Sequence, residues 1–143
     1  MSSAYNNKNK APDSKKNNKN AVLDTSALMA LFYNEEGADQ VSELLDQSCL
    51  SVLTLCEILD QLHQKGGSVK EMEAQLKKLD LDIRLFDEEQ ACLATDLLSQ
   101  STGRRISFFD RAAIALAIAL QLPLYTRQHA WIDLKLPIQI IAL

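Results

Sequence analysis

The sequence predicts an α/β protein built on a mainly parallel five-stranded sheet that is flanked by helices. Two observations lead to this class. Short apolar stretches of strand length alternate along the chain with longer segments whose apolar residues recur at helical spacing. Strands separated by helices are the order that a parallel sheet requires. At 143 residues, the chain is long enough for one domain with a single substantial core.

The first twenty residues differ from the rest in composition. They contain five lysines and six asparagines against one acid, Asp13, and almost nothing to bury. We expect residues 1–20 to form a disordered Lys/Asn-rich tail and residues 21–143 to form the folded domain. The tail carries +4, so the net charge of −4 leaves −8 for the domain. An acidic domain is a poor general binder of nucleic acid, because affinity for phosphate rests on Lys and Arg.

The first half of the domain begins with a buried strand. Residues 21–23 are apolar and run into Asp24, after which a helical pattern starts at once. Residues 34–37 contain Asn and Gly and break that helix, and Gly66 and Gly67 end a later one. The elements expected in this half are strands at 21–23 and 49–53 and helices at 27–33, 38–47, 54–65 and 68–79.

A continuous apolar run marks the main helix of the second half. Residues 112–120 contain only Ala, Ile and Leu, which predicts a helix buried on all sides. The run is too short to span a bilayer, and Pro123 ends the helix. The elements expected in this half are strands at 83–86, 124–126 and 138–142 and helices at 87–100 and 107–121.

Three acidic residues follow expected strands or begin expected helices. Asp24 comes directly after the first strand, Glu57 lies four residues after the second, and Asp110 lies in the first turn of the apolar helix. In an open parallel sheet, ligands bind beyond the carboxyl ends of the strands. The sequence therefore predicts that these three carboxylates share one edge of the sheet.

Each acid also has a purely structural interpretation. Thr54-x-x-Glu57 and Ser107-x-x-Asp110 both match the capping box, in which an acid at the third helical position bonds back to the cap. Asp24 fits an ordinary turn residue. Taken one at a time, these interpretations are favoured, and only the joint pattern favours a site.

Three carboxylates at one edge would repel one another and would be costly to remove from water. A divalent cation relieves both costs, and Mg²⁺ or Mn²⁺ suits oxygen ligands without His or Cys. We therefore expect Asp24, Glu57 and Asp110 to be catalytic residues that hold Mg (or Mn). Such an ion activates water and stabilises the charge that develops on a phosphate during displacement.

The cysteines and histidines indicate neither zinc nor disulfides. Three Cys without a CxxC pair and two separated His are too few for a zinc cluster, and the Cys are read as small apolar side chains. No secretion signal or membrane segment is visible. These features predict a cytoplasmic protein with no membrane partner.

With these residues assembled, the sequence resembles the PIN-domain ribonucleases and, within them, the VapC toxins of toxin–antitoxin pairs. The match covers nearly all of residues 21–143. VLDTSALMALF resembles the opening strand and first acid of the family, LSVLTLCEIL the block that ends in Glu57, and SFFDRAAIALAIALQLPLYT the block that contains Asp110. A family pattern of Thr-x-Asp before an aromatic residue corresponds to TRQHAW here.

The resemblance implies a three-layer PIN-like fold and a metal-dependent endoribonuclease that hydrolyses RNA phosphodiester bonds. It implies an RNA substrate, commonly structured RNA such as tRNA. It also implies a homodimer and a cognate antitoxin protein that inserts a segment into the site. The function expected is that of the toxin of a VapBC-type pair.

The sequence departs from the family pattern at Gln128, where a fourth acid is expected. A Gln carbonyl can still orient a water but contributes no charge. A first metal position built from three acids is unaffected, whereas a second would be held more weakly. Asp133, five residues later, is a candidate to compensate, and a solvent-facing position is an equal interpretation for it. The alternative function is a weakened or inactive PIN domain that binds RNA or protein.

Supporting roles are expected around the acids. Ser26, Thr126 and Gln128 are candidates to orient the ligand carboxylates, although Ser26 fits a helix cap equally well. Arg104, Arg105 and Arg111 are candidates to bind RNA phosphates, and for Arg111 a structural salt bridge is at least as good an interpretation. A phosphatase of the haloacid dehalogenase type needs a second Asp where Ser26 stands, which argues against that class.

Overall fold

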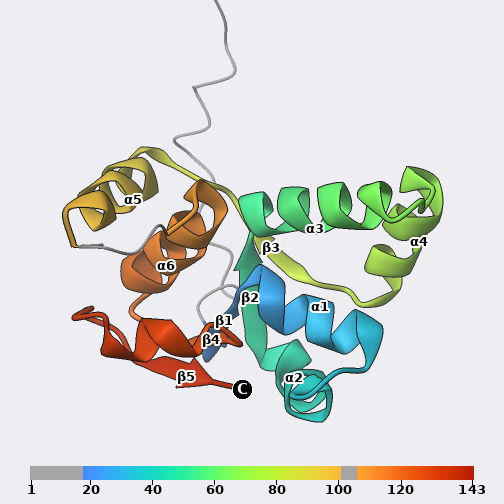
Figure 1. Cartoon of the computed structure of the whole chain (residues 1–143), viewed down its shortest axis with the longest axis horizontal. Coiled ribbons are helices and arrows are strands. Elements are labelled where there is room, and N and C mark those ends of the chain that lie inside the picture. The colour runs from blue at the N-terminus through green and yellow to red at the C-terminus, as the bar shows by residue number, and fades with distance from the viewer. Residues whose placement is uncertain (1–17, 101–105) are drawn as a thin grey trace, which may run out of the picture.

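The computed structural model describes residues 18–100 and 106–143. Five strands form one sheet, and every pair of neighbouring strands is parallel. Helices pack on both sides of the sheet (Figure 1), which confirms the predicted three-layer α/β fold. Most of the predicted tail, residues 1–17, and the loop with Arg104 and Arg105 lie outside the described residues.

The strands follow the order β3-β2-β1-β4-β5 across the sheet. Their bounds are β1 Ala21–Leu23, β2 Ser48–Ser51, β3 Asp82–Arg84, β4 Leu124–Thr126 and β5 Ile140–Ala142. The chain first builds outward from β1 to β3 and later returns to the other side of β1 with β4. The sheet therefore reverses its direction of growth between β1 and β4, which is where open α/β sheets form their binding crevices.

The helices agree with the predicted ones in number and order, with shifts of one to three residues at their ends. They are α1 Thr25–Tyr33, α2 Ala38–Leu44, α3 Val52–Gln64, α4 Val69–Lys78, α5 Glu88–Gln100 and α6 Phe108–Leu120, with short 3₁₀ turns at Leu45–Gln47 and His129–Asp133. The helix predicted at 38–47 ends as a 3₁₀ turn. The helix predicted to open at Thr54 begins earlier, because Ser51 caps it through a bond from Leu53 N (3.1 Å).

The sheet divides the interior into two apolar clusters. Val22 and Cys49 face the cluster that contains α6, whereas their neighbours Leu23 and Leu50 face the cluster that contains α1. This alternation is the two-residue period of a strand buried on both faces. The central part of α6, Ala112–Ala117, is buried as the apolar run predicts. The two clusters fix β1 from both sides and thereby fix the residue that follows it.

Two features outside the core bear on the sequence predictions. Cys49 is buried, but Cys56 and Cys92 are exposed, so the reading of all three as apolar side chains is wrong for two of them. Their helices, α3 and α5, each bury one stripe only, and these cysteines lie outside it. Within the described residues, no helix combines the length and apolar character needed to cross a membrane.

Candidate active site at the carboxyl edge of the sheet

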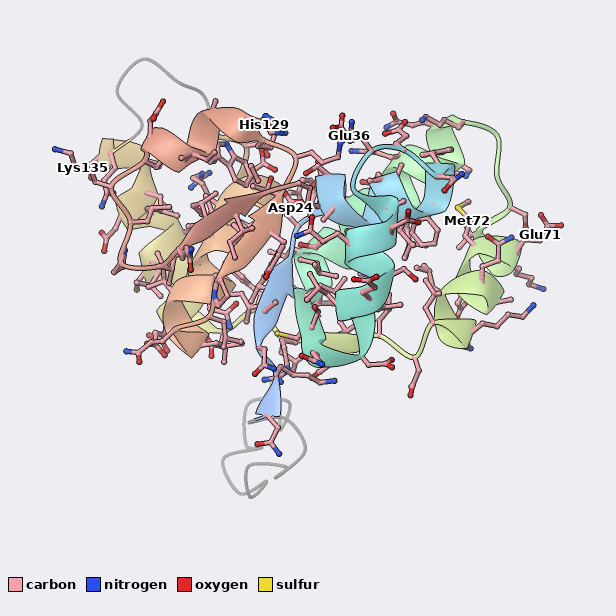
Figure 2. The ribbon with its side chains drawn as sticks, turned by 90° about the horizontal axis from the view of Figure 1, so that it is seen from below. Asp24, Glu36, Glu71, Met72, His129 and Lys135 are labelled. Carbon is pink, nitrogen blue, oxygen red and sulfur yellow. The ribbon has the colours of Figure 1, made fainter. Side chains whose placement is uncertain are left out.

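Asp24 lies where β1 ends and α1 begins. Its side chain is 1% exposed and caps α1, accepting a hydrogen bond from the backbone N–H of Ala27 (2.8 Å). The cap is therefore Asp24 and not Ser26, so the interpretation of Ser26 as a helix cap is wrong. Figure 2 shows Asp24 in the middle of the molecule, between the half that carries His129 and the half that carries Glu36.

Two hydroxyl groups join Asp24 to β4. Ser26 Oγ donates to Asp24 Oδ1 (2.8 Å), and Thr126 Oγ1 donates to Asp24 Oδ2 (2.5 Å). Each hydroxyl also accepts a backbone N–H from the chain after β4, Ser26 from Arg127 (2.9 Å) and Thr126 from Gln128 (2.9 Å). The supporting residues predicted from the sequence thus lie around Asp24, and they fix its carboxylate at the point where the sheet reverses.

Glu57 comes from α3 on the other side of the pocket. Its Oε2 accepts a hydrogen bond from Thr25 Oγ1 (2.6 Å), and its Oε1 accepts a longer one from Gln61 Nε2 (3.4 Å). The capping-box interpretation of Glu57 is wrong, because Thr54 lies inside the helix and its buried hydroxyl makes no hydrogen bond among the described residues. Glu57 is therefore held across the fold, by a residue next to Asp24.

Asp110 lies in the first turn of α6. Ser107 caps this helix, and its hydroxyl accepts the backbone N–H of Asp110 (3.2 Å). The capping-box interpretation is thus consistent with Asp110, whose carboxyl also receives hydrogen bonds from Ser107 that lower its pKa. The cap and the site are compatible roles, because the carboxylate also faces the pocket that Glu57 lines.

The electrostatics show that the three acids lie close together. Burial raises the pKa of Asp24, and the charge of Glu57 raises it further, against three hydrogen bonds that lower it. The pKa of Asp110 rises to about 6, mainly through burial and also through the charges of Glu57 and Asp24. Within the described part of the chain, no cation contributes to either shift. Asp24 and Asp110 are therefore harder to ionise, first because they are buried and further because acidic neighbours lie near them.

A pocket of about 250 Å³ opens over these residues. It is lined by Thr25, Ser26, Met29, Glu35, Glu57, Gln61, Asp110, Arg127 and Gln128. Asp24 lies beneath it, bonded to Ser26. The lining contains three acids and one basic residue, Arg127. Larger depressions elsewhere on the protein contain neither Asp24, Glu57 nor Asp110, so the chemistry of the side chains and not the size of the cavity identifies the site.

Other predicted residues lie elsewhere. Arg111 points toward α5, where its Nη1 donates to the carbonyl of Ala94 (2.9 Å) and its guanidinium lies 5.7 Å from the centre of the Phe108 ring. These contacts pack Arg111 between α5 and α6 through a carbonyl and an aromatic ring, instead of through the salt bridge that was the alternative interpretation. Asp133 is exposed in the 3₁₀ turn after β4 and is not part of the lining described above.

Several residues of the site were not predicted. Thr25 adjoins Asp24, but its contact with Glu57 spans 32 positions and leaves no local pattern. Gln61 lies four residues after Glu57, and that helical spacing is a signal that was available. Glu35 and Arg127 form an ion pair at the pocket between a loop and the end of β4. Only the fold brings these two together.

The carboxylate oxygens of Asp24, Glu57 and Asp110 suit a hard divalent ion, but the side chains do not stand close enough to enclose one. Among residues 18–100 and 106–143, no three Asp, Glu, His or Cys side chains stand close enough to enclose a metal. Carboxylates that repel one another, with no cation between them, nevertheless have the chemistry that Mg²⁺ and Mn²⁺ prefer.

A sheet that reverses beside a buried Asp, with two further acids brought in by α3 and α6, defines a family. The model of the PIN domain matches residues 21–134, and the chain belongs to the PIN-domain family. PIN-domain proteins are generally nucleases that use divalent metal ions. No curated protein matches this chain.

Solved structures with the same fold come from toxin–antitoxin systems. VapBC2 from Rickettsia felis bound to a promoter DNA fragment has a TM-score of 0.69 and 17% identity over 86% of this chain and 98% of that one. VapBC-5 from Mycobacterium tuberculosis has a TM-score of 0.60 and 26% identity, over 86% and 98%. A toxin–antitoxin complex from Klebsiella pneumoniae has a TM-score of 0.66 and 20% identity, over 85% and 95%.

Proposed function

We propose that this protein is a metal-dependent endoribonuclease that uses Mg (or Mn) to hydrolyse RNA phosphodiester bonds. One observation carries the proposal. Asp24, Glu57 and Asp110 come from three separate elements; Glu57 and Asp110 line the pocket where the sheet reverses, and burial together with the charges of acidic neighbours raises the pKa values of Asp24 and Asp110. Buried acids that repel one another destabilise a fold unless a bound cation neutralises them. Their arrangement therefore favours a functional site over three unrelated helix caps.

The side chains would divide the work between them. Asp24, Glu57 and Asp110 would hold the ion, which when bound would activate water and neutralise charge on the phosphate. Asp24 is already oriented by Ser26 and Thr126, so it would serve as the fixed ligand. One of the three acids would also accept a proton during attack on the phosphodiester. Gln128 would orient a water without adding charge.

We further propose that the protein is the toxin of a VapBC-type pair. The support is that relatives of the same fold were solved as toxin–antitoxin complexes and are covered almost completely by this chain. The partners would be an RNA substrate, such as tRNA, and a cognate antitoxin that enters the pocket. A homodimer is consistent with the exposed apolar side chains of Leu85 and Phe108, which are 78% and 46% exposed.

The test compares Asp110→Asn with a matched control. RNA cleavage is measured while Mn²⁺ is titrated, and Mn²⁺ binding is followed separately by its electron paramagnetic resonance signal. We expect saturable cleavage by the wild type and by Asp96→Asn, an exposed acid on α5. Asp110→Asn should bind Mn²⁺ less tightly and lose cleavage. Equal cleavage by both variants, with contaminating nuclease excluded, would contradict the site.

The second candidate is a PIN domain that binds RNA or protein without cutting. The observation that favours it is Gln128, which lines the pocket where an acid would hold a second ion. In that case the wild type would bind RNA but show no cleavage at any Mn²⁺ concentration. The same titration therefore decides between the two functions.

A further inference from the structure

Arg127 is the one basic residue among those that line the pocket, beside the acids Glu35, Glu57 and Asp110. A phosphodiester that enters this pocket is negatively charged and meets a carboxylate on most sides. Phosphate oxygens in protein–nucleic acid contacts are bound mainly by Arg and Lys, and Arg offers two parallel donors. The placement of this guanidinium beside Asp110 and Glu57 therefore calls for a role.

The backbone on both sides of the Arg127–Glu35 ion pair is fixed. Arg127 N–H donates to Ser26 Oγ (2.9 Å), which ties it to the Asp24 carboxylate. Glu35 follows the left-handed residue Asn34 (φ 50°) that ends α1, and its N–H donates to the carbonyl of Ala30 (2.9 Å). The two side chains therefore rearrange on a fixed backbone, with Arg127 among the residues that line the pocket.

The ion pair itself is easily exchanged. The side chains of Arg127 and Glu35 are 34% and 49% exposed, and exposed ion pairs of this kind contribute little to stability. A phosphate can therefore replace Glu35 as the partner of Arg127 without a large cost to the fold. Until then, Glu35 is the partner of the Arg127 guanidinium.

We propose that Arg127 is a substrate-binding residue that holds a backbone phosphate of the RNA at the mouth of the pocket. Glu35 is its resting partner and competes with the phosphate. This rests on the proposed function for the identity of the substrate, but it concerns binding and not the cleavage step. Arg127 thereby supplies locally the positive charge that the acidic domain otherwise lacks for RNA.

The test measures binding of a short fluorescein-labelled single-stranded RNA by anisotropy. All variants are made in the full chain with Asp110→Asn, so that cleavage does not consume the probe. Lys135→Gln is the matched control, because it removes the same charge from an exposed position that Figure 2 places far from Asp24. Arg127→Lys tests whether charge alone suffices, and Glu35→Gln breaks the same ion pair from the other side.

We expect Arg127→Gln to weaken RNA binding about tenfold relative to Lys135→Gln, as for the loss of one charge-assisted hydrogen bond. Its slope of log affinity against log salt should fall by about 0.7, the value for one phosphate of a single strand. Arg127→Lys should recover part of the affinity. Glu35→Gln should tighten binding by roughly threefold, because the competing carboxylate is gone. With Asp110 intact, Arg127→Gln should raise KM for RNA more than it lowers kcat.

Three results would overturn the proposal. The first is that Arg127→Gln and Lys135→Gln have the same affinity and salt slope. The second is that the protein with intact Arg127 does not bind the RNA. The third is that Glu35→Gln weakens binding as much as Arg127→Gln, because the ion pair would then serve the fold. Loss of binding in Arg127→Gln together with no cleavage by the wild type would support this inference and contradict the nuclease function. Metal-dependent cleavage with unchanged binding would do the reverse.

Discussion

Asp24 and Asp110 both stand at the start of a helix beside one pocket, but the protein holds them differently. Asp24 is almost fully buried, and its carboxylate accepts bonds from Ala27, Ser26 and Thr126. Asp110 is only partly buried, and its hydrogen bonds come from Ser107 in its own cap. One acid is fixed by the sheet, whereas the other is fixed by its helix alone.

This difference separates stability from chemistry at the two positions. The donors around Asp24 would lose their acceptor if it were removed, so Asp24 is part of the structure that joins β1 to β4. The donors to Asp110 come only from the exposed Ser107 of its own cap, and the cost of burying Asp110 near Glu57 and Asp24 is the larger effect. In the metal-free protein, the two acids should therefore affect the free energy of unfolding in opposite directions.

The largest effect on stability is expected for Asp24→Ala. The change removes a helix cap, worth about 1 kcal/mol, and leaves the buried Thr126 hydroxyl and the Ser26 hydroxyl without their acceptor, at about 1–3 kcal/mol. The change also removes a buried carboxylate, and the gain from no longer burying it offsets part of this loss of stability. We expect a net loss of about 1–3 kcal/mol in the free energy of unfolding, measured by urea denaturation without metal.

Asp24→Asn is the control for this change. The amide oxygen can still accept the Ala27 N–H, so most of the cap should remain. An equal loss of stability in both variants would mean that the charge, or the acceptor for Thr126 that an amide NH2 cannot replace, matters more than the helix cap. No loss in Asp24→Ala would contradict the structural role that distinguishes this acid from Asp110.

Asp110→Asn should act in the opposite direction. The pKa of Asp110 is raised from 3.8 to about 6, so the folded state binds more protons than the unfolded chain between these pH values. The stability that protonation provides is full below pH 3.8 and is lost as the pH rises through 6. Metal-free Asp110→Asn should be more stable than the wild type at pH 7, by about 1 kcal/mol after allowance for its partial exposure.

Denaturation curves at several pH values check this prediction. The fall in stability between pH 4 and pH 6 should be smaller in the variant than in the wild type, because Asp110 no longer titrates. Some fall should remain, because the pKa of Asp24 is also raised. Saturating Mg²⁺ should reverse the order, since a ligand that binds only the native wild type stabilises it. A variant that is less stable at pH 7 without metal would contradict the view that Asp110 is there for chemistry.

The same contrast explains how much of the site could be predicted from the sequence. Asp24, Glu57 and Asp110 follow strand ends or begin helices, and parallel strands bring such positions to one edge. Ser26 and Thr126 were candidates for the same reason. The contacts of Thr25 with Glu57 and of Glu35 with Arg127 were not predictable in this way, because each joins distant segments through side-chain placement alone.

The strand order illustrates the same limit for the fold. The alternation of strands and helices predicts a parallel sheet, but not that β4 pairs with β1 instead of β3. The cap of α3 was misplaced because Thr54-x-x-Glu57 fits a capping box as well as a helix interior. Ser51, at the end of a strand as short as β2, gave no distinct signal.

The smallest effect on stability, and the sharpest test of the pocket, is expected for Gln128→Asp. Gln128 lines the pocket beside Glu57 and Asp110, and its backbone N–H holds Thr126. A fourth acid there adds repulsion, so we expect metal-free stability to change by less than about 1 kcal/mol. It also adds charge where an ion would bind, so the Mn²⁺ concentration for half-maximal cleavage should fall. Asp24 would remain the fixed ligand, and the lining of the pocket would gain a further acid beside Glu57 and Asp110.

Gln128→Asn is the control, because it shortens the side chain without adding charge. Its metal requirement should match that of the wild type. An identical response of both variants would mean that position 128 affects the pocket through the shape of the side chain and not through its charge. A lower metal requirement in Gln128→Asp only would show that this side of the pocket is tuned by charge, while the side built on Asp24 is set by hydrogen bonds.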